Sequence, residues 1–109
     1  TDKEIQYGIH AGDIETSVML ALDPQNVNMQ KAENFISEVS KLNEQFKYIS
    51  INSLAKIAWQ AQDLNKMGAC GNAKIATSKK GKITVNYVCK KLVEVFNEIE
   101  KVPISFVSN

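Results

Sequence analysis

The lone histidine of the sequence, His10, lies where general acid–base chemistry is possible. Gly8 and Gly12 flank it, and Asp13 and Glu15 follow at three and five residues. An imidazole beside a carboxylate can move protons near neutral pH, because the carboxylate fixes the ring tautomer and raises its basicity. The alternative is structural: His10 hydrogen-bonds in a turn, Asp13 caps a helix and Glu15 meets its dipole. Spacing alone favours this structural alternative.

The same residues do not make a metal site or a nucleophilic site. One histidine with two acids falls short of the two or three separated ligand groups usual for catalytic zinc or manganese. His10 could only complete a site whose main ligands lie elsewhere. Cys70 lies in a glycine-rich segment without a histidine nearby in sequence, and Cys89 falls on the apolar side of an expected helix, so neither is predicted to be a nucleophile. No phosphate-binding or dinucleotide-binding glycine motif is present.

Length and composition indicate one domain of ordinary type. The chain has 109 residues, 44% of them hydrophobic and 23% charged, with a formal net charge of +1. This balance gives no electrostatic reason to expect nucleic-acid binding. No apolar window is long enough for a membrane span, and acidic residues near the start argue against a targeting peptide. Two cysteines without disulfide or metal spacing are typical of free thiols, so we expect a cytoplasmic protein.

Periodicity and capping signals predict the elements that would position these residues. Ile14, Val18 and Leu22 recur every four residues, which indicates a mostly buried helix that Asp23 and Pro24 end. A second apolar stripe predicts a long C-terminal helix with a solvated lysine-rich start, and Asn28 is expected to cap the middle helix. The expected elements are an extended segment over 1–10, helices over 13–22, 30–45 and 77–101, strands over 48–51 and 57–59, and a loop over 62–76. Trp59 ends the second strand as a core or rim residue, with substrate stacking as the less favoured alternative.

Two blocks of the sequence resemble the creatininase (creatinine amidohydrolase) superfamily. The first is Gly8-Ile-His-Ala-Gly-Asp-Ile-Glu-Thr-Ser-Val-Met-Leu-Ala-Leu22, which is similar to the family signature of a histidine, a glycine and Glu-Thr-Ser before a Met-Leu-rich helix. The second is more degenerate and comprises Trp59, Asp63-Leu-Asn65, Gly68-Ala-Cys-Gly-Asn72 and Ala76-Thr-Ser-Lys-Lys-Gly81. The blocks occur in family order, so the resemblance covers nearly the whole chain.

The resemblance implies a metal-dependent amidohydrolase of α/β class. The family fold is a three-layer α/β/α sandwich, of which this segment would be a mostly helical part with a few short strands. Family members hold two divalent metals (zinc, manganese or iron), and a metal-activated water hydrolyses a cyclic or linear amide. The resemblance gives His10 the role of proton shuttle and Glu15 that of orienting the histidine or its loop. Asp13 stands where many members have another residue and is given no catalytic role.

The family's metal ligands precede the histidine block, and this sequence has no second histidine. We therefore expect residues 1–109 to be the C-terminal segment of one creatininase-like domain, binding no metal and inactive by itself. The full-length protein is expected to be an enzyme that takes a small-molecule amide, binds neither nucleic acid nor membrane, and forms a homo-oligomer, a hexamer in the family. The alternatives are a non-catalytic interaction module, whose 48–59 region pairs with a partner's sheet edge, and a subunit that completes an active site with a partner chain.

Overall fold

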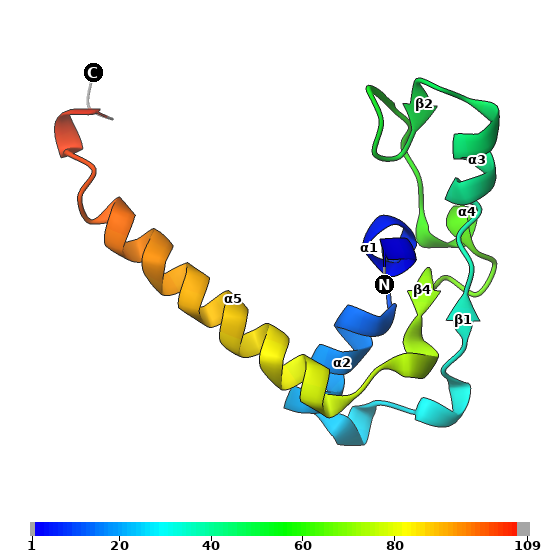
Figure 1. The fold of residues 1–109 in the computed structure, drawn as a ribbon, viewed down its shortest axis with the longest axis horizontal. Helices are drawn as coiled ribbons and strands as arrows, with labels where there is room; N and C mark the ends of the chain where they lie inside the picture. Colours follow the sequence, from blue (N-terminus) through cyan, green and yellow to red (C-terminus); the bar gives the residue numbers. More distant parts are fainter. Residues whose placement is uncertain (1, 107–109) are drawn as a thin grey trace.

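A computed structural model describes residues 2–106. Figure 1 shows a body of short elements from which one long helix, α5, projects. The elements are α1 (Asp2–Tyr7), α2 (Asp13–Leu22), η1 (Pro24–Asn26), η2 (Met29–Lys31), β1 (Asn34–Phe35), α3 (Val39–Gln45), β2 (Ile49–Ser50), β3 (Ala55–Lys56), α4 (Ala61–Leu64), β4 (Gly71–Asn72), η3 (Ala73–Ile75), α5 (Ser78–Ile99) and η4 (Ile104–Phe106). The chain is thus mixed α/β, mainly helical with a few short strands, as the sequence predicts.

The two strongest helix predictions are confirmed. Helix α2 has the predicted bounds, and α5 begins after Thr77, whose hydroxyl accepts a hydrogen bond from the Lys80 N–H at 3.3 Å. Pro103 lies beyond the end of α5, where it cannot continue the helix. One detail differs: Gly12 is the N-cap of α2, and Asp13 is its first helical residue. Helix α2 packs along the first turns of α5 and so joins the body to the long helix.

The extended conformation expected for 1–10 is wrong for the described part of that segment. Residues 2–7 form α1, and Thr1 lies outside the described residues. The alternation of three apolar residues is short, whereas lysine, glutamate and glutamine have high helix propensity. Gly8 follows the last helical residue and donates its N–H to the carbonyl of Glu4 at 2.8 Å, which closes the helix.

The helix predicted over 30–45 is wrong in its first half. Residues 29–31 form a 3₁₀ turn, which the Asn28 side chain caps as predicted by accepting the Gln30 N–H at 3.0 Å. Strand β1 follows and pairs antiparallel with β4, with Asn34 opposite Asn72 and residue 35 opposite residue 71. Only the second half, α3, is helical. The pairing partner is distant in sequence, so local periodicity could not reveal it.

The region 48–76 is more regular than expected. Strand β2 falls inside the predicted strand 48–51, but its partner β3 covers residues 55–56 in place of 57–59, and the two pair in parallel. The predicted loop 62–76 contains most of α4, then β4 and η3. A capping box explains α4: the Gln60 side chain accepts the Asp63 N–H, and the Asp63 carboxylate accepts the Gln60 N–H at 2.8 Å.

The apolar core of the described residues is small. Its main cluster comprises Val39, Ile51, Leu64 and Cys70. The radius of gyration is 17.8 Å, against about 13 Å for a compact chain of this length. The prediction that α2 is mostly buried is wrong, because Ile14 is 51% exposed and Leu22 is 65% exposed. Among the described residues, no helix combines the length and apolar character required to cross a bilayer.

Candidate functional site

His10 lies at the junction between the body and α2, held by its backbone. Its N–H donates to the carbonyl of Cys70 at 3.1 Å, and its carbonyl accepts the Cys70 N–H at 2.7 Å. These two bonds form an isolated antiparallel bridge beside β4. The bridge fixes the main chain of His10 and leaves the imidazole half-exposed. Sixty residues separate the two segments, and no local pattern in the sequence indicates that they meet.

Glu15 lies next to His10, the residue that it is proposed to orient. Its Oε2 is 3.8 Å from Nδ1 of the imidazole, and the two side chains are 58% and 53% exposed. The same oxygen accepts a hydrogen bond from the Ala11 N–H. Because Glu15 contacts both the ring and the turn that carries it, one carboxylate can orient the imidazole.

The turn between His10 and α2 has an unusual backbone. Ala11 has φ of +54°, the left-handed region that costs a residue with a Cβ about 1–2 kcal/mol. Its carbonyl accepts the Thr16 hydroxyl at 3.2 Å, in addition to the bond from its N–H to Glu15. Two residues of the Glu-Thr-Ser motif therefore hold the turn in a conformation that its own alanine disfavours.

His10 and Glu15 open onto a cavity of about 420 Å³, in the size range of small-molecule sites. The cavity lies between α2 and the segment that runs from η1 to β1. Its other lining residues are Ala11, Thr16, Met19, Asn26, Val27, Asn28, Met29, Lys31, Ala32, Phe35, Ala69 and Ala73. Trp59 is not among them, and its indole is partly exposed in the segment before α4.

The thiol of Cys70 does not take part in this site. The side chain is fully buried, and burial raises the pKa of the thiol, although a hydrogen bond with Ser37 opposes the shift. A buried thiol with a raised pKa is a poor nucleophile, in agreement with the sequence prediction. Cys89 is exposed on α5.

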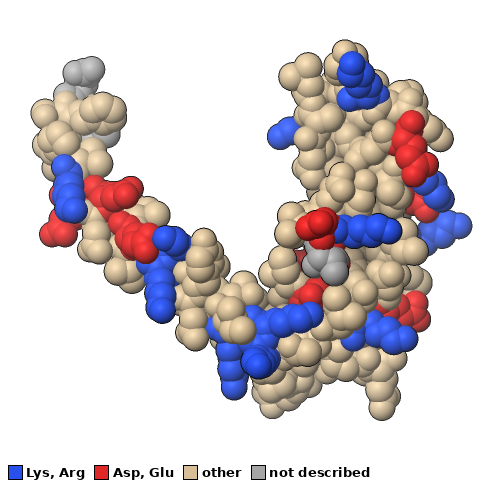
Figure 2. Space-filling view, in the orientation of Figure 1, with Lys and Arg blue, Asp and Glu red and all other residues tan. Residues whose placement is uncertain are grey.

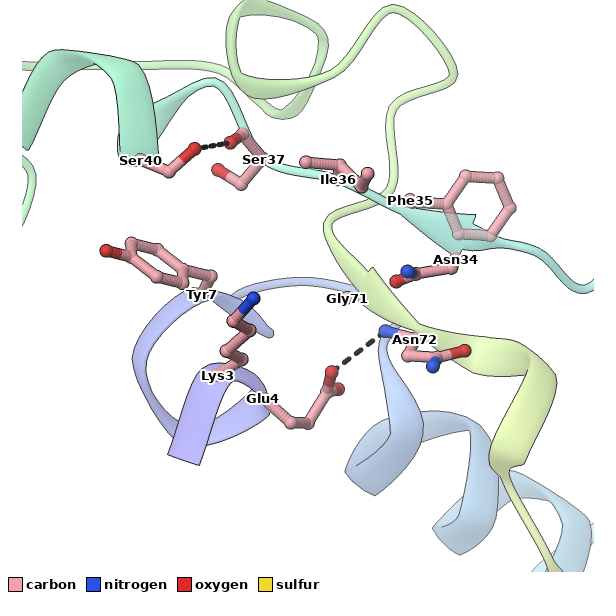
Figure 3. A pocket seen from close by; sticks show the side chains of 10 residues that line it. All are labelled: Lys3, Glu4, Tyr7, Asn34, Phe35, Ile36, Ser37, Ser40, Gly71 and Asn72. Atoms are coloured by element: carbon pink, nitrogen blue, oxygen red, sulfur yellow. Dashed lines mark hydrogen bonds between the residues drawn. The ribbon is translucent and has the colours of Figure 1, made fainter. Parts of the chain in front are cut away.

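Glu4 is a buried polar residue that the sequence predictions overlooked. The residue is only 7% exposed. Its two carboxylate oxygens accept hydrogen bonds from the N–H groups of Asp13 (2.6 Å) and Asn72 (2.8 Å). Figure 3 shows the carboxylate directed at Asn72, on one side of a second cavity of about 290 Å³. The signal in the sequence is the pair Gly8 and Gly12, because glycine allows other groups to approach the main chain closely.

A second polar cluster fastens α2 to the start of α5. Asp13 is nearly buried, and Lys80 Nζ lies 2.8 Å and 3.0 Å from its two carboxylate oxygens. The fully buried Ser17 donates to Asp13 at 3.1 Å and accepts the Thr77 N–H at 3.0 Å. Figure 2 shows lysines gathered where α5 begins, yet Lys80 is paired and not merely solvated as predicted. Asp13 thus links α2 to α5 through Ser17 and Lys80.

The residues that the structure describes do not fit a metal centre. Among residues 2–106, no three His, Cys, Asp or Glu side chains come close enough together to hold an ion. His10 and Glu15 offer two ligand groups at most, and Glu4 is already committed to two backbone N–H groups.

Comparison with known proteins defines the class. The family model described as creatinine amidohydrolase matches residues 1–96, and the chain belongs to the creatininase family. A crystal structure from Bacteroides fragilis, named "putative creatinine amidohydrolase", superposes with a TM-score of 0.68 at 28% identity. The alignment covers 91% of this chain and 37% of that one, so the chain spans little more than a third of the relative's length. No curated protein matches significantly.

Proposed function

We propose that residues 1–109 form the C-terminal part of a creatininase-like amidohydrolase that acts on a cyclic or linear amide. Family membership supports the activity class. The observation that carries the proposal is the His10–Glu15 pair, 3.8 Å apart at the mouth of a cavity large enough for a small amide. In this proposal the protein works in the cytoplasm as a homo-oligomer.

His10 is the proton shuttle of the proposed reaction. Its neutral ring accepts a proton from the attacking water and then delivers it to the nitrogen of the scissile amide. Glu15 orients the ring and offsets the positive charge while the proton is held. The 3.8 Å separation is longer than a hydrogen bond and shortens when substrate binds, as catalytic contacts often do.

The metal dependence of the family is a proposal for this protein. Since the described residues do not supply a ligand set, we propose that the metal ligands lie outside this segment, in the remainder of the domain. The 109-residue chain alone is then expected to show neither stoichiometric zinc or manganese binding nor metal-dependent amide hydrolysis. Such binding by the purified chain would contradict the proposal.

The test is the rate of amide release by the full-length, metal-loaded protein over a panel of cyclic and linear amides, creatinine included. Removal of a general acid–base group costs about 10²–10⁴-fold in rate, so His10→Gln should lower kcat by this amount and Glu15→Gln by less. Glu98→Gln, an exposed glutamate far along α5, is the matched control and should leave the rate unchanged. Equal rates for His10→Gln and the wild type would refute the assignment.

A second candidate function, a non-catalytic association module, is favoured by one observation. The apolar face of α5 is exposed along its length, with Ile83, Leu92 and Phe96 each at least 48% exposed. Large exposed apolar surfaces mark interfaces. Size measurement of the full-length protein separates the candidates when it is combined with the assay: stable association without hydrolysis of any amide supports the module.

A further inference from the structure

We infer that Glu4 is a positioning residue that holds the His10 turn in place. The inference rests on the proposed function, in which His10 moves the proton. Glu4 accepts hydrogen bonds from the backbone on either side of the site, and it acts through them. We refer to Glu4 with Gly8, Gly12, Asp13, Gly71 and Asn72 as the Glu4 cluster.

The carboxylate joins two consecutive helices to a strand that is distant in sequence. Glu4 belongs to α1, Asp13 is the first residue of α2, and Asn72 belongs to β4. One oxygen accepts the Asp13 N–H at 2.6 Å and the other accepts the Asn72 N–H at 2.8 Å. Asp13 follows His10 by three residues, and Asn72 follows its bridge partner Cys70 by two. The carboxylate thus connects residues 10–13 with residues 70–72, the same two segments that the His10–Cys70 bridge joins.

Glu4 also supplies the N-terminal cap that α2 lacks. The N-cap residue, Gly12, has no side chain to accept a hydrogen bond from the first turn. An acceptor at this position satisfies an otherwise unpaired N–H, and a negative charge there is stabilised by the helix dipole. Burying a carboxylate is costly unless it is hydrogen-bonded, and these two backbone bonds meet that requirement.

Three glycines leave room for the carboxylate. A Cβ added at Gly8, Gly12 or Gly71 would overlap Glu4 Oε1, and one at Gly71 would also lie 2.6 Å from the Cα of Gly12. Gly71 has φ of +139°, which residues with a Cβ rarely adopt. The three glycines let the main chain pass close to the Glu4 carboxylate. The position of the carboxylate therefore restricts where the backbone before and after His10 can lie.

The functional consequence is that the His10 imidazole is held in a defined position. Displacement of a reacting group by about 1 Å can cost about 10²-fold in rate. Loss of either backbone bond at Glu4 would remove one attachment of the turn, which would then be held by the Cys70 bridge and by the bonds of Ala11 to Glu15 and Thr16. We therefore expect Glu4 to affect the rate of the chemical step more than the affinity for substrate.

Glu4→Gln in the full-length, metal-loaded protein tests the inference. Glutamine has the same shape, but its NH₂ group faces one of the two N–H donors, so at least one bond is lost. We expect kcat to fall about 10–100-fold with KM within about twofold of the wild type, the split expected when an interaction of the transition state is removed. Gly12→Ala, which displaces the carboxylate from the other side, should reproduce the effect. Glu98→Gln is the matched control and should change neither constant.

Two readouts do not depend on activity. Hydrogen exchange at the Asp13 and Asn72 amides should accelerate in Glu4→Gln while exchange within α5 is unchanged. The His10 Cε1–H resonance, assigned by its loss in His10→Gln, should shift or broaden in Glu4→Gln and not in Glu98→Gln. A wild-type protein without hydrolytic activity overturns the proposed function, and the resonance still decides whether Glu4 positions the ring. An unchanged resonance, or unchanged kcat despite faster exchange at both amides, overturns the positioning role.

Discussion

The Glu4 cluster and the outer part of α5 differ in which kind of side chain they bury. In the cluster, a charged side chain is buried, its oxygens are hydrogen-bonded, and glycines bring backbones into close contact. Along α5 beyond Gly81, apolar side chains are exposed and the helix runs away from the body (Figure 1). The Glu4 cluster therefore buries polar groups, and the outer part of α5 exposes apolar side chains.

The difference teaches which structural requirements the described residues meet by themselves. Hydrogen bonds around Glu4 and His10 are completed by segments within the chain, so this geometry is self-contained. Among residues 2–106, nothing covers the apolar stripe of α5 over most of its length. Hydrophobic burial is the main favourable term in folding, and this stripe contributes little of it here. Three measurements test how sharp the contrast is.

The two cysteines should give the largest effect, because Cys70 adjoins Gly71 of the Glu4 cluster and Cys89 lies on α5. Cys70 is fully buried with a pKa raised by burial, so at any pH below that pKa it holds less thiolate than an ordinary thiol. Cys89 is exposed on α5. We expect iodoacetamide at pH 8 to label Cys89 at least about 100-fold faster than Cys70, measured by mass spectrometry of peptides. Urea should equalise the two rates. Comparable rates in the native protein would show that the region around His10 opens readily.

Gly81→Ala should give an intermediate effect at the point where the two regions join. A Cβ at Gly81 would overlap the backbone carbonyl of Ser17 in α2. Overpacking of this kind costs about 1–3 kcal/mol in the free energy of unfolding, which denaturation with urea can measure. Asn86→Ala, at an exposed position of the same helix, is the control and should stay within about 0.5 kcal/mol. Helix propensity alone predicts that Gly81→Ala stabilises by about 1 kcal/mol, and that result would contradict the close packing.

Leu92→Ala should give the smallest effect. Leu92 is 48% exposed on α5, and its truncation is expected to change the free energy of unfolding of the 109-residue chain by no more than about 0.5 kcal/mol. The same substitution at Leu64, which is 5% exposed in the core, should cost about 2–5 kcal/mol. Similar costs at the two leucines would mean that the apolar face of α5 is covered in solution, and the contrast between the regions would fail.

Local signals predicted the elements that have strong local causes. Helix α2 is bounded by a glycine and by Asp23-Pro24, and α5 by Thr77 and Pro103, so both were predicted within two residues. The strand β1 was missed because its partner β4 is more than thirty residues away. The burial of Ser17 and Asp13 was missed for the same reason, since each is buried by a segment that follows long after it.

The sequence by itself determined the family, the helices α2 and α5 and the proximity of His10 to Glu15, because His10 lies three residues before α2 and Glu15 lies in the first turn of that helix. Only the tertiary structure decided what holds that turn. The Cys70 bridge and the carboxylate of Glu4 come from segments whose meeting depends on packing across the whole body. Backbone hydrogen bonds between distant segments leave no periodic trace in the sequence, and glycines mark only that a close approach occurs.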